Sequence, residues 1–356
     1  MGKMPKRAIL VIEWGYARSL LVCMISISLV GCTRIKEHTL REGARAKAET
    51  VSLSGKADEL AIWIHPKDPK QSLIIGNDKS VMGGLFAYDL QGHLITRSEY
   101  INEATGVSVR YGIQLSTGTV DIVGCAVRGT NEIKVFSIDP TTRKLIDITS
   151  PEGIPTGFLK DTYGFCFYKR ASDGQLFAFV SKKGTDYIHQ IILYDDGMGK
   201  IRGSLVRKLG LKEQKSFVEG MVADDEYGYF YCSDETHAIL KYHADPNVPK
   251  DPFIRAFGVG DGIRGDREGL AIYKKGKGKG YLIVSSQGNS TFKIYQREGN
   301  NKFIKTAALH GVSKTDGIAT TSQPIPPYYP TGIFAAHNDG DNNYLFFDWY
   351  EFSRIK

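Results

Sequence analysis

The sequence repeats one short pattern six times. Each copy has a polar residue, then glycine or a residue in its place, then a short apolar run. The second position falls at 59, 106, 164, 220, 269 and 317, so the repeat is about 50 residues long. A regular period of this length is typical of folds built from equivalent units. The copies are Asp58-Glu-Leu-Ala-Ile-Trp63, Thr105-Gly-Val-Ser-Val109, Tyr163-Gly-Phe-Cys-Phe167, Glu219-Gly-Met-Val222, Glu268-Gly-Leu-Ala-Ile272 and Asp316-Gly-Ile318.

Further strand patterns follow each copy. A turn segment and a second alternating run come next, as in Tyr281-Leu-Ile-Val284, and a third run ends in an aromatic or aliphatic pair. Period-two alternation bounded by Gly, Asp and Asn indicates strands. Units of this length fit four-stranded blades. We therefore predict an all-β fold, a six-bladed β-propeller of four-stranded antiparallel blades over residues 51–356. A sandwich or two β-domains is the alternative, which the regular period disfavours.

The first 32 residues have the pattern of an export signal. Basic residues precede the apolar run from Ser19 to Val30, which ends in Gly31 and Cys32. This ending resembles the bacterial lipoprotein box, in which the cysteine is lipidated. An ordinary signal peptide that contains a cysteine is the alternative. We expect a lipoprotein-type signal over 1–32, a polar tether over 33–50, and an exported protein anchored by lipid, in an outer membrane because Thr33 replaces the aspartate of inner-membrane retention.

Charge and cysteine content exclude other classes of protein. The formal net charge of the 356 residues is +7 and is spread diffusely, which argues against a nucleic-acid partner. Cys125, Cys166 and Cys232 lack Cys-x-x-Cys spacing, so a zinc site is unsupported. We expect buried thiols, with one disulfide possible. We also expect a monomer whose contact with a membrane is limited to the lipid anchor.

The opening residues of the six copies are expected to meet around the propeller axis, because the first strand of each blade lines the central channel. Carboxylates crowded there raise one another's pKa unless cations lie among them. Oxygen ligands without converging His or Cys favour calcium. Hydrogen bonding of each carboxylate to backbone amides is the alternative. The residues expected at this mouth are Asp58, Glu59, Tyr163, Glu219, Glu268 and Asp316, with Asp266 nearby.

Basic residues follow the second run in three consecutive blades. Lys79, Arg128 and the pair Lys182 and Lys183 occupy this position in the first, second and third copies. A single basic residue in a loop is commonly a solvated charge. Three at one structural position predict a site for a phosphate-sized anion beside the carboxylates.

Taken together, these segments resemble the β-propeller phytases, six-bladed calcium-dependent phosphatases that act on inositol hexakisphosphate (phytate). The resemblance runs from about Gly55 to the C-terminal end and implies attack on phosphorus by a calcium-activated water. It implies phosphate binding by Lys79, Arg128, Tyr163 and Lys183, with Arg128, Lys183 and Tyr163 stabilising charge and Glu219 and Glu268 bridging ions. The implied calcium ligands are Asp58, Glu219, Asp266, Glu268, Asp316 and Gln287, with Asn338 and Asp339 nearby. The segments that carry it are Asp58-Glu-Leu-Ala-Ile-Trp-Ile-His-Pro66, Thr162-Tyr-Gly-Phe165, Glu219-Gly-Met-Val-Ala-Asp-Asp-Glu-Tyr-Gly228, Asp266-Arg-Glu-Gly-Leu270, Gly280-Tyr-Leu-Ile-Val-Ser-Ser-Gln-Gly-Asn289 and Thr315-Asp-Gly-Ile318.

Some positions depart from the family pattern. Ser108 and Ala319 stand where the family has aspartate, and Asp78 replaces one of two lysines in the first-blade loop. The paired acids Asp234-Glu235 are retained. A propeller that has lost efficient turnover and serves as a surface binding module is therefore the alternative to a phosphomonoester hydrolase.

Overall fold

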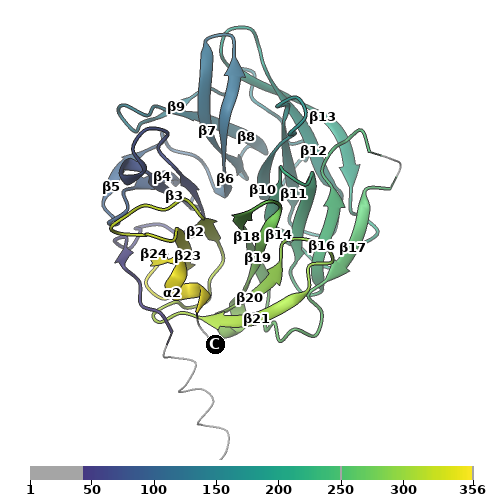
Figure 1. Ribbon diagram of the computed structural model, residues 1–356. Helices are drawn as coiled ribbons and strands as arrows, with labels where there is room; N and C mark the ends of the chain where they lie inside the picture. The colour runs from purple at the N-terminus through teal and green to yellow at the C-terminus, as the bar shows by residue number, and fades with distance from the viewer. Residues whose placement is uncertain (1–42, 249–250, 355–356) are drawn as a thin grey trace, which may run out of the picture. The chain divides into compact units, whose positions relative to one another are not determined.

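The computed structural model describes residues 43–248 and 251–354, and all of these belong to one compact unit, Leu40–Lys356 (Figure 1). The predicted signal over 1–32, the predicted lipidation site Cys32 and the first part of the predicted tether lie outside the described residues. Within the described ranges, no helix has both the length and the apolar character needed to cross a membrane.

Six four-stranded antiparallel sheets form the blades of a propeller, which confirms the predicted fold class. The first blade contains β2 (Ala57–Trp63), β3 (Leu73–Asp78), β4 (Gly84–Tyr88) and β5 (Leu94–Arg97), and the second β6 (Ala104–Leu115), β7 (Gly118–Val127), β8 (Glu132–Ile138) and β9 (Leu145–Asp147). The third contains β10 (Thr162–Lys169), β11 (Leu176–Lys182), β12 (Ile188–Asp195) and β13 (Ile201–Leu209), and the fourth β14 (Val218–Asp224), β15 (Tyr229–Asp234), β16 (Ala238–His243) and β17 (Phe253–Phe257). The fifth contains β18 (Arg267–Gly276), β19 (Lys279–Ser286), β20 (Thr291–Gln296) and β21 (Phe303–Ala308), and the sixth β22 (Ile318–Thr321), β23 (Ile333–Asn338), β24 (Asn343–Asp348) and β1 (Ala48–Glu49).

Helical structure among the described residues is limited to short segments. The 3-10 turns η1 (Pro69–Gln71) and η2 (Gln287–Asn289) lie between strands, and helix α2 (Trp349–Ser353) follows β24. Figure 1 shows the inner strands β2, β6, β10, β14 and β18 around the centre, with the later strands of each blade farther out. This arrangement brings the openings of the repeats together.

The sixth blade is completed by the N-terminal strand. Ala48 pairs with Phe346 and Glu49 with Leu345, so β1 becomes the outer strand beside β24. The predicted fold boundary at residue 51 is therefore too late, and the last part of the predicted tether belongs to the propeller. A two-residue strand is too short to show the alternation that marks the other strands. Joining the two ends of the chain in one sheet closes the ring without leaving β24 as an exposed edge.

Six apolar clusters fill the spaces between neighbouring blades. Phe179 and Phe230, for example, stack at 4.0 Å between the third and fourth blades. Cys125, Cys166 and Cys232 are buried free thiols, as expected. Each blade thus buries its two faces against two neighbours, which fixes how the inner strands approach one another.

Two glycines of the repeat lie where the inner strands nearly touch. A Cβ atom on Gly164 would lie 2.3 Å from the carbonyl oxygen of Glu219, and one on Gly220 would lie 2.1 Å from that of Glu268. No side chain fits at such distances. The repeat therefore needs glycine because each inner strand packs backbone to backbone on the next.

Candidate metal and phosphate site

In the first five blades, the polar residue of the repeat lies at a β-bulge at the start of the inner strand. The pairing of β14 with β15, for example, shifts between Val218 and Met221, and that of β18 with β19 shifts between Arg267 and Leu270. A bulge bends a strand and redirects its side chains. The first ring of the site is formed in this way by Asp58, Thr105, Tyr163, Glu219 and Glu268, with Asp316 just before β22.

A second ring follows from where the second strand of each blade ends. The first residue after that strand donates its backbone N–H to a carbonyl just before the blade's inner strand, at 2.7 to 3.1 Å in all six blades. This repeated hydrogen bond places six equivalent residues beside the first ring. They are Lys79, Arg128, Lys183, Glu235, Gln287 and Asp339.

The second ring divides the mouth into two halves. We call blades one to three the basic half, because its members there are Lys79, Arg128 and Lys183. We call blades four to six the acidic half, because its members there are Glu235, Gln287 and Asp339. The acids of the first ring lie mainly in the acidic half as well. Basic and acidic side chains of the second ring are therefore gathered on opposite sides of one mouth.

Buried carboxylates crowd the acidic half. Carboxylate oxygens of Glu219, Glu235 and Glu268 lie within 4.8 Å of one another, and all three residues are buried. Oε1 of Glu219, Oε1 of Glu235 and Oε2 of Glu268 have no hydrogen-bond partner. The side chain of Asp58, fully buried nearby, has an unpartnered Oδ2. Because buried polar atoms are normally paired, these oxygens fit a cation better than backbone capping.

Electrostatics support the same conclusion. Burial, reinforced by Asp58, raises the pKa of Glu219 to about 8 and that of Asp316 to about 6. Burial and the charge of Asp266 raise the pKa of Glu235 to about 7. Burial, together with Glu219, raises the pKa of Glu268 well above its usual value. Cations held among these groups would restore the charged forms. Oxygen donors of this kind fit calcium.

Tyr163 lies at the border of the two halves. Its hydroxyl donates a hydrogen bond of 2.5 Å to Oε2 of Glu219. The guanidinium of Arg128 and the ammonium of Lys183 each lie 5.2 Å from the centre of its ring. Two cations from neighbouring blades thus face one aromatic ring next to the carboxylate of Glu219. A phosphate group placed here would contact both cations.

Lys79 has a different environment from the other two bases. Its ammonium bonds to Asp58 and lies 3.8 Å from Oδ2 of Asp316. Burial alone would lower the pKa of Lys79, but Asp58, Glu219 and Asp316 outweigh it and raise that pKa. Lys79 therefore acts as a counter-charge to the carboxylates of the first ring, and the predicted contact with phosphate would be additional to this role.

The remaining predicted ligands lie at the edge of the acidic half. Gln287 donates from Nε2 to Oδ1 of Asp316 at 2.5 Å, so it joins the cluster. Asp266 is half-buried beside Glu235 and accepts the backbone N–H of Gln287 through its carbonyl oxygen. Lys182 is the last residue of β11 and pairs with Asp186 at 3.1 Å. Lys183, one residue later, is the member of the ring.

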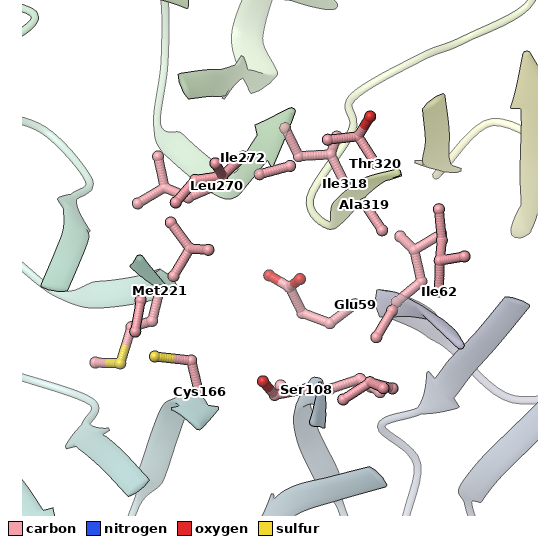
Figure 2. A pocket seen from close by; sticks show the side chains of 18 of the residues that line it. Glu59, Ile62, Ser108, Cys166, Met221, Leu270, Ile272, Ile318, Ala319 and Thr320 are labelled. Atoms are coloured by element: carbon pink, nitrogen blue, oxygen red, sulfur yellow. The ribbon is translucent and has the colours of Figure 1, made fainter. Parts of the chain in front are cut away.

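Two acidic residues were given no ligand role from the sequence. Glu235 belongs to the buried trio, although the sequence singled it out only as part of a retained acidic pair. The position of Glu235 could have identified it, because Glu235 directly follows the second strand of its blade, as Lys79, Arg128 and Lys183 do in theirs. Glu59 was expected at the mouth, but its side chain points into the channel instead (Figure 2).

His337 is a further buried residue that the sequence did not reveal. Nδ1 of His337 accepts the backbone N–H of Asp316 at 3.1 Å, and its Nε2 has no partner. Burial lowers the pKa of His337 to about 4, which keeps the ring neutral. This hydrogen bond fixes the backbone from which the Asp316 carboxylate extends.

Serines of the second strands hold neighbouring blades in register. The hydroxyl of Ser181 donates to the carbonyl of Val218, that of Ser233 to Glu268 and that of Ser285 to Thr315. Each bond runs from one blade to the opening of the next inner strand. The openings of three inner strands are thus each held by a serine of the preceding blade. Such supporting hydrogen bonds orient the residues of an ion site.

A cavity lined by both polar and apolar side chains lies along the channel. Its volume is about 340 Å³, and Ile62, Met221 and Leu270 are among its lining residues. Figure 2 shows that Ser108, Ala319 and Glu59 all line this cavity. The two positions at which the sequence lacks an expected aspartate therefore lie in the channel. Neither of these two departures replaces a carboxylate of the first or second ring.

Comparison with known proteins agrees with this geometry. A family model described as phytase matches residues 12–344. The chain is 35% identical over 349 residues to a 3-phytase of Bacillus subtilis (strain 168), covering 96% of this chain and 88% of that protein. The chain belongs to the phytase family. Phytases are phosphoric monoester hydrolases, and the chain is assigned to this class of enzyme.

A solved structure shares the fold alone. A luciferin-regenerating enzyme matches with a TM-score of 0.52 at 12% identity, covering 84% of this chain and 94% of the other. Identity at this level supports the propeller architecture and says nothing about the reaction. The phytase assignment rests on the family match and the curated relative.

Proposed function

We propose that this protein is a calcium-dependent phytase that hydrolyses phosphomonoesters of inositol hexakisphosphate. The observation that carries the proposal is the buried trio of Glu219, Glu235 and Glu268, each of which has an unpartnered carboxylate oxygen. Several calcium ions would be held by the predicted ligands Asp58, Glu219, Asp266, Glu268, Asp316 and Gln287, with Glu235 added from the structure.

Calcium bound there would neutralise phosphate oxygens and lower the pKa of a coordinated water. The chain's own residues would bind and orient the substrate. Arg128 and Lys183 would contact the phosphate oxygens, since both already face the ring of Tyr163. The hydroxyl of Tyr163 would keep Glu219 in place, as its hydrogen bond does now. Charge on the phosphate would thus be stabilised from both halves of the mouth.

The decisive experiment measures phosphate release from inositol hexakisphosphate by residues 33–356, first with calcium and then with excess chelator. This segment includes all six sheets and the closing strand β1. The proposal expects release with calcium and none with chelator. Release that continues in chelator would contradict calcium dependence, and no release in either condition would contradict the phytase function.

The alternative of a binding module with weak turnover is favoured by Ser108 and Ala319 in the channel. Ser108→Asp separates the two functions, because it restores a carboxylate on the channel wall that also carries Glu59. A large gain in the calcium-dependent rate would indicate a weakened enzyme. Calcium binding without phosphate release in both the original chain and the variant would indicate a binding module.

We also propose that the chain is exported and anchored by lipid on Cys32, at a bacterial outer membrane. The support is the sequence pattern of the leader. Cys32→Ser should move the protein from the membrane fraction to the soluble fraction of cells. Unchanged membrane attachment would contradict lipidation at this residue.

A further inference from the structure

Large hydrophobic side chains are exposed unevenly at the two ends of the propeller. Among the described residues, seven large hydrophobic side chains have an exposed fraction of 62% or more. Six lie in loops at the end that carries the two rings, and Met198 in the turn between β12 and β13 lies at the other end. The six are Val51, Val81, Met82, Tyr100, Leu159 and Val259.

Val81, Met82 and Tyr100 form one patch beside the basic half, and Leu159 is a fourth exposed residue on that half. Val81 and Met82 are 62% and 64% exposed, in the loop that follows Lys79. Tyr100 belongs to the adjacent loop, which is joined to the first by the hydrogen bond from Ile101 N–H to the carbonyl of Gly83 at 3.1 Å. Leu159, 99% exposed, extends from the loop before β10. Leu159 lies in the loop that also leads to Tyr163.

Cations accompany these apolar tips. The guanidinium of Arg97 lies 5.2 Å from the centre of the Tyr100 ring. Lys160, whose side chain is 79% exposed, directly follows Leu159. Exposed aliphatic and aromatic side chains flanked by lysine or arginine are the pattern of surfaces that lie at a lipid interface. The tips come from several blades around the mouth, so they suit a planar surface better than a compact protein epitope.

We propose that the ring-bearing end of the propeller docks on a lipid bilayer that displays phosphate headgroups, a membrane contact beyond the lipid anchor to which the sequence limited it. Val81, Met82 and Leu159 enter the interface, and Arg97 and Lys160 contact the headgroup phosphates. Docking in this orientation points the phosphate site at the lipid surface. The docking surface does not depend on catalysis, so a failure of the proposed phytase function would leave its binding test intact.

The test is sedimentation of residues 33–356 with vesicles of phosphatidylcholine containing phosphatidic acid, in buffer with calcium. The triple variant Val81→Ser, Met82→Ser, Leu159→Ser should reduce the vesicle-bound fraction about tenfold, because three aliphatic side chains no longer leave water. The matched control Met198→Ser removes an exposed hydrophobic side chain at the opposite end and should bind as the original chain does.

Two further readouts complete the test. The triple variant should keep its melting temperature and its rate on soluble inositol hexakisphosphate, because the three side chains are exposed and none of them belongs to either ring. Vesicles of phosphatidylcholine alone should bind the original chain more weakly than those with phosphatidic acid. Absence of vesicle binding, equal binding by the triple variant, or an equal loss in Met198→Ser would overturn the proposal.

Discussion

The basic and acidic halves of the mouth have the same backbone and opposite chemistry. In each half the residue after the second strand donates the same backbone hydrogen bond to the loop before the inner strand. Blades one to three place Lys79, Arg128 and Lys183 at that point, whereas blade four places Glu235 there. The repeated backbone thus sets where each second-ring residue lies, and the side chain at that point sets its charge.

The comparison explains how crowded carboxylates are tolerated. The ammonium of Lys79 lies 3.8 Å from Oδ2 of Asp316, and Tyr163 donates to Glu219, so the two halves meet at charge-assisted contacts. Glu235 and Glu268 have no such partner for one oxygen each. The proposed cations would provide partners for these unpartnered oxygens of the acidic half.

The largest expected effect comes from the acidic half. Glu268→Gln keeps the size of the side chain and removes one charged ligand, so calcium-dependent phosphate release should fall by about 100-fold or more. Steady-state rates on inositol hexakisphosphate measure this, with thermal unfolding as a check on folding. A variant rate close to that of the original chain would exclude Glu268 from the site.

Removing calcium should make stability depend on pH. The folded-state pKa values of Glu219, Glu235 and Asp316 are raised to about 8, 7 and 6, above their unfolded values. The protonated forms stabilise the fold, so in chelator the free energy of unfolding should be highest below about pH 4 and fall as the pH rises towards 8. The loss should approach about 1.4 kcal/mol per pH unit for each such group.

Denaturant unfolding at several pH values measures this dependence. Calcium should largely abolish the loss above pH 6, because it stabilises the ionised carboxylates. A chelated protein whose stability rises over this range would show that the acidic half is not strained without cations.

A smaller effect is expected in the basic half. Lys183→Ala should raise KM for inositol hexakisphosphate about tenfold, since one charge-assisted contact with phosphate is lost. Lys182→Ala is the matched control, because Lys182 pairs with Asp186 and should leave KM nearly unchanged. If the two variants behaved alike, the second ring would not define the phosphate site.

The smallest effect is expected in the channel. Ser108→Ala removes the hydroxyl that accepts the backbone N–H of Phe167 at 3.1 Å, so the free energy of unfolding should drop by about 1 kcal/mol. Phosphate release should hardly change, because Ser108 belongs to neither ring. A large loss of activity would extend the functional site into the channel.

Much of this architecture could be predicted from the sequence because it repeats. The period fixed the number of blades and the first ring. Other features depend on exact strand ends or on contacts between distant residues. Lys182 and Lys183 were both expected to bind phosphate, because the alternating run does not show which residue ends β11. The bond between Ser233 and Glu268, and the pairing of β1 with β24, join blades whose approach no local pattern records.

A crystal structure of residues 33–356 with calcium tests the central claim most directly. The account predicts calcium density in contact with carboxylate oxygens of Glu219, Glu235 and Glu268, at distances of about 2.3 to 2.6 Å. Calcium found only on exposed loops, with Glu219 and Glu268 protonated and bonded to each other or to water, would contradict it.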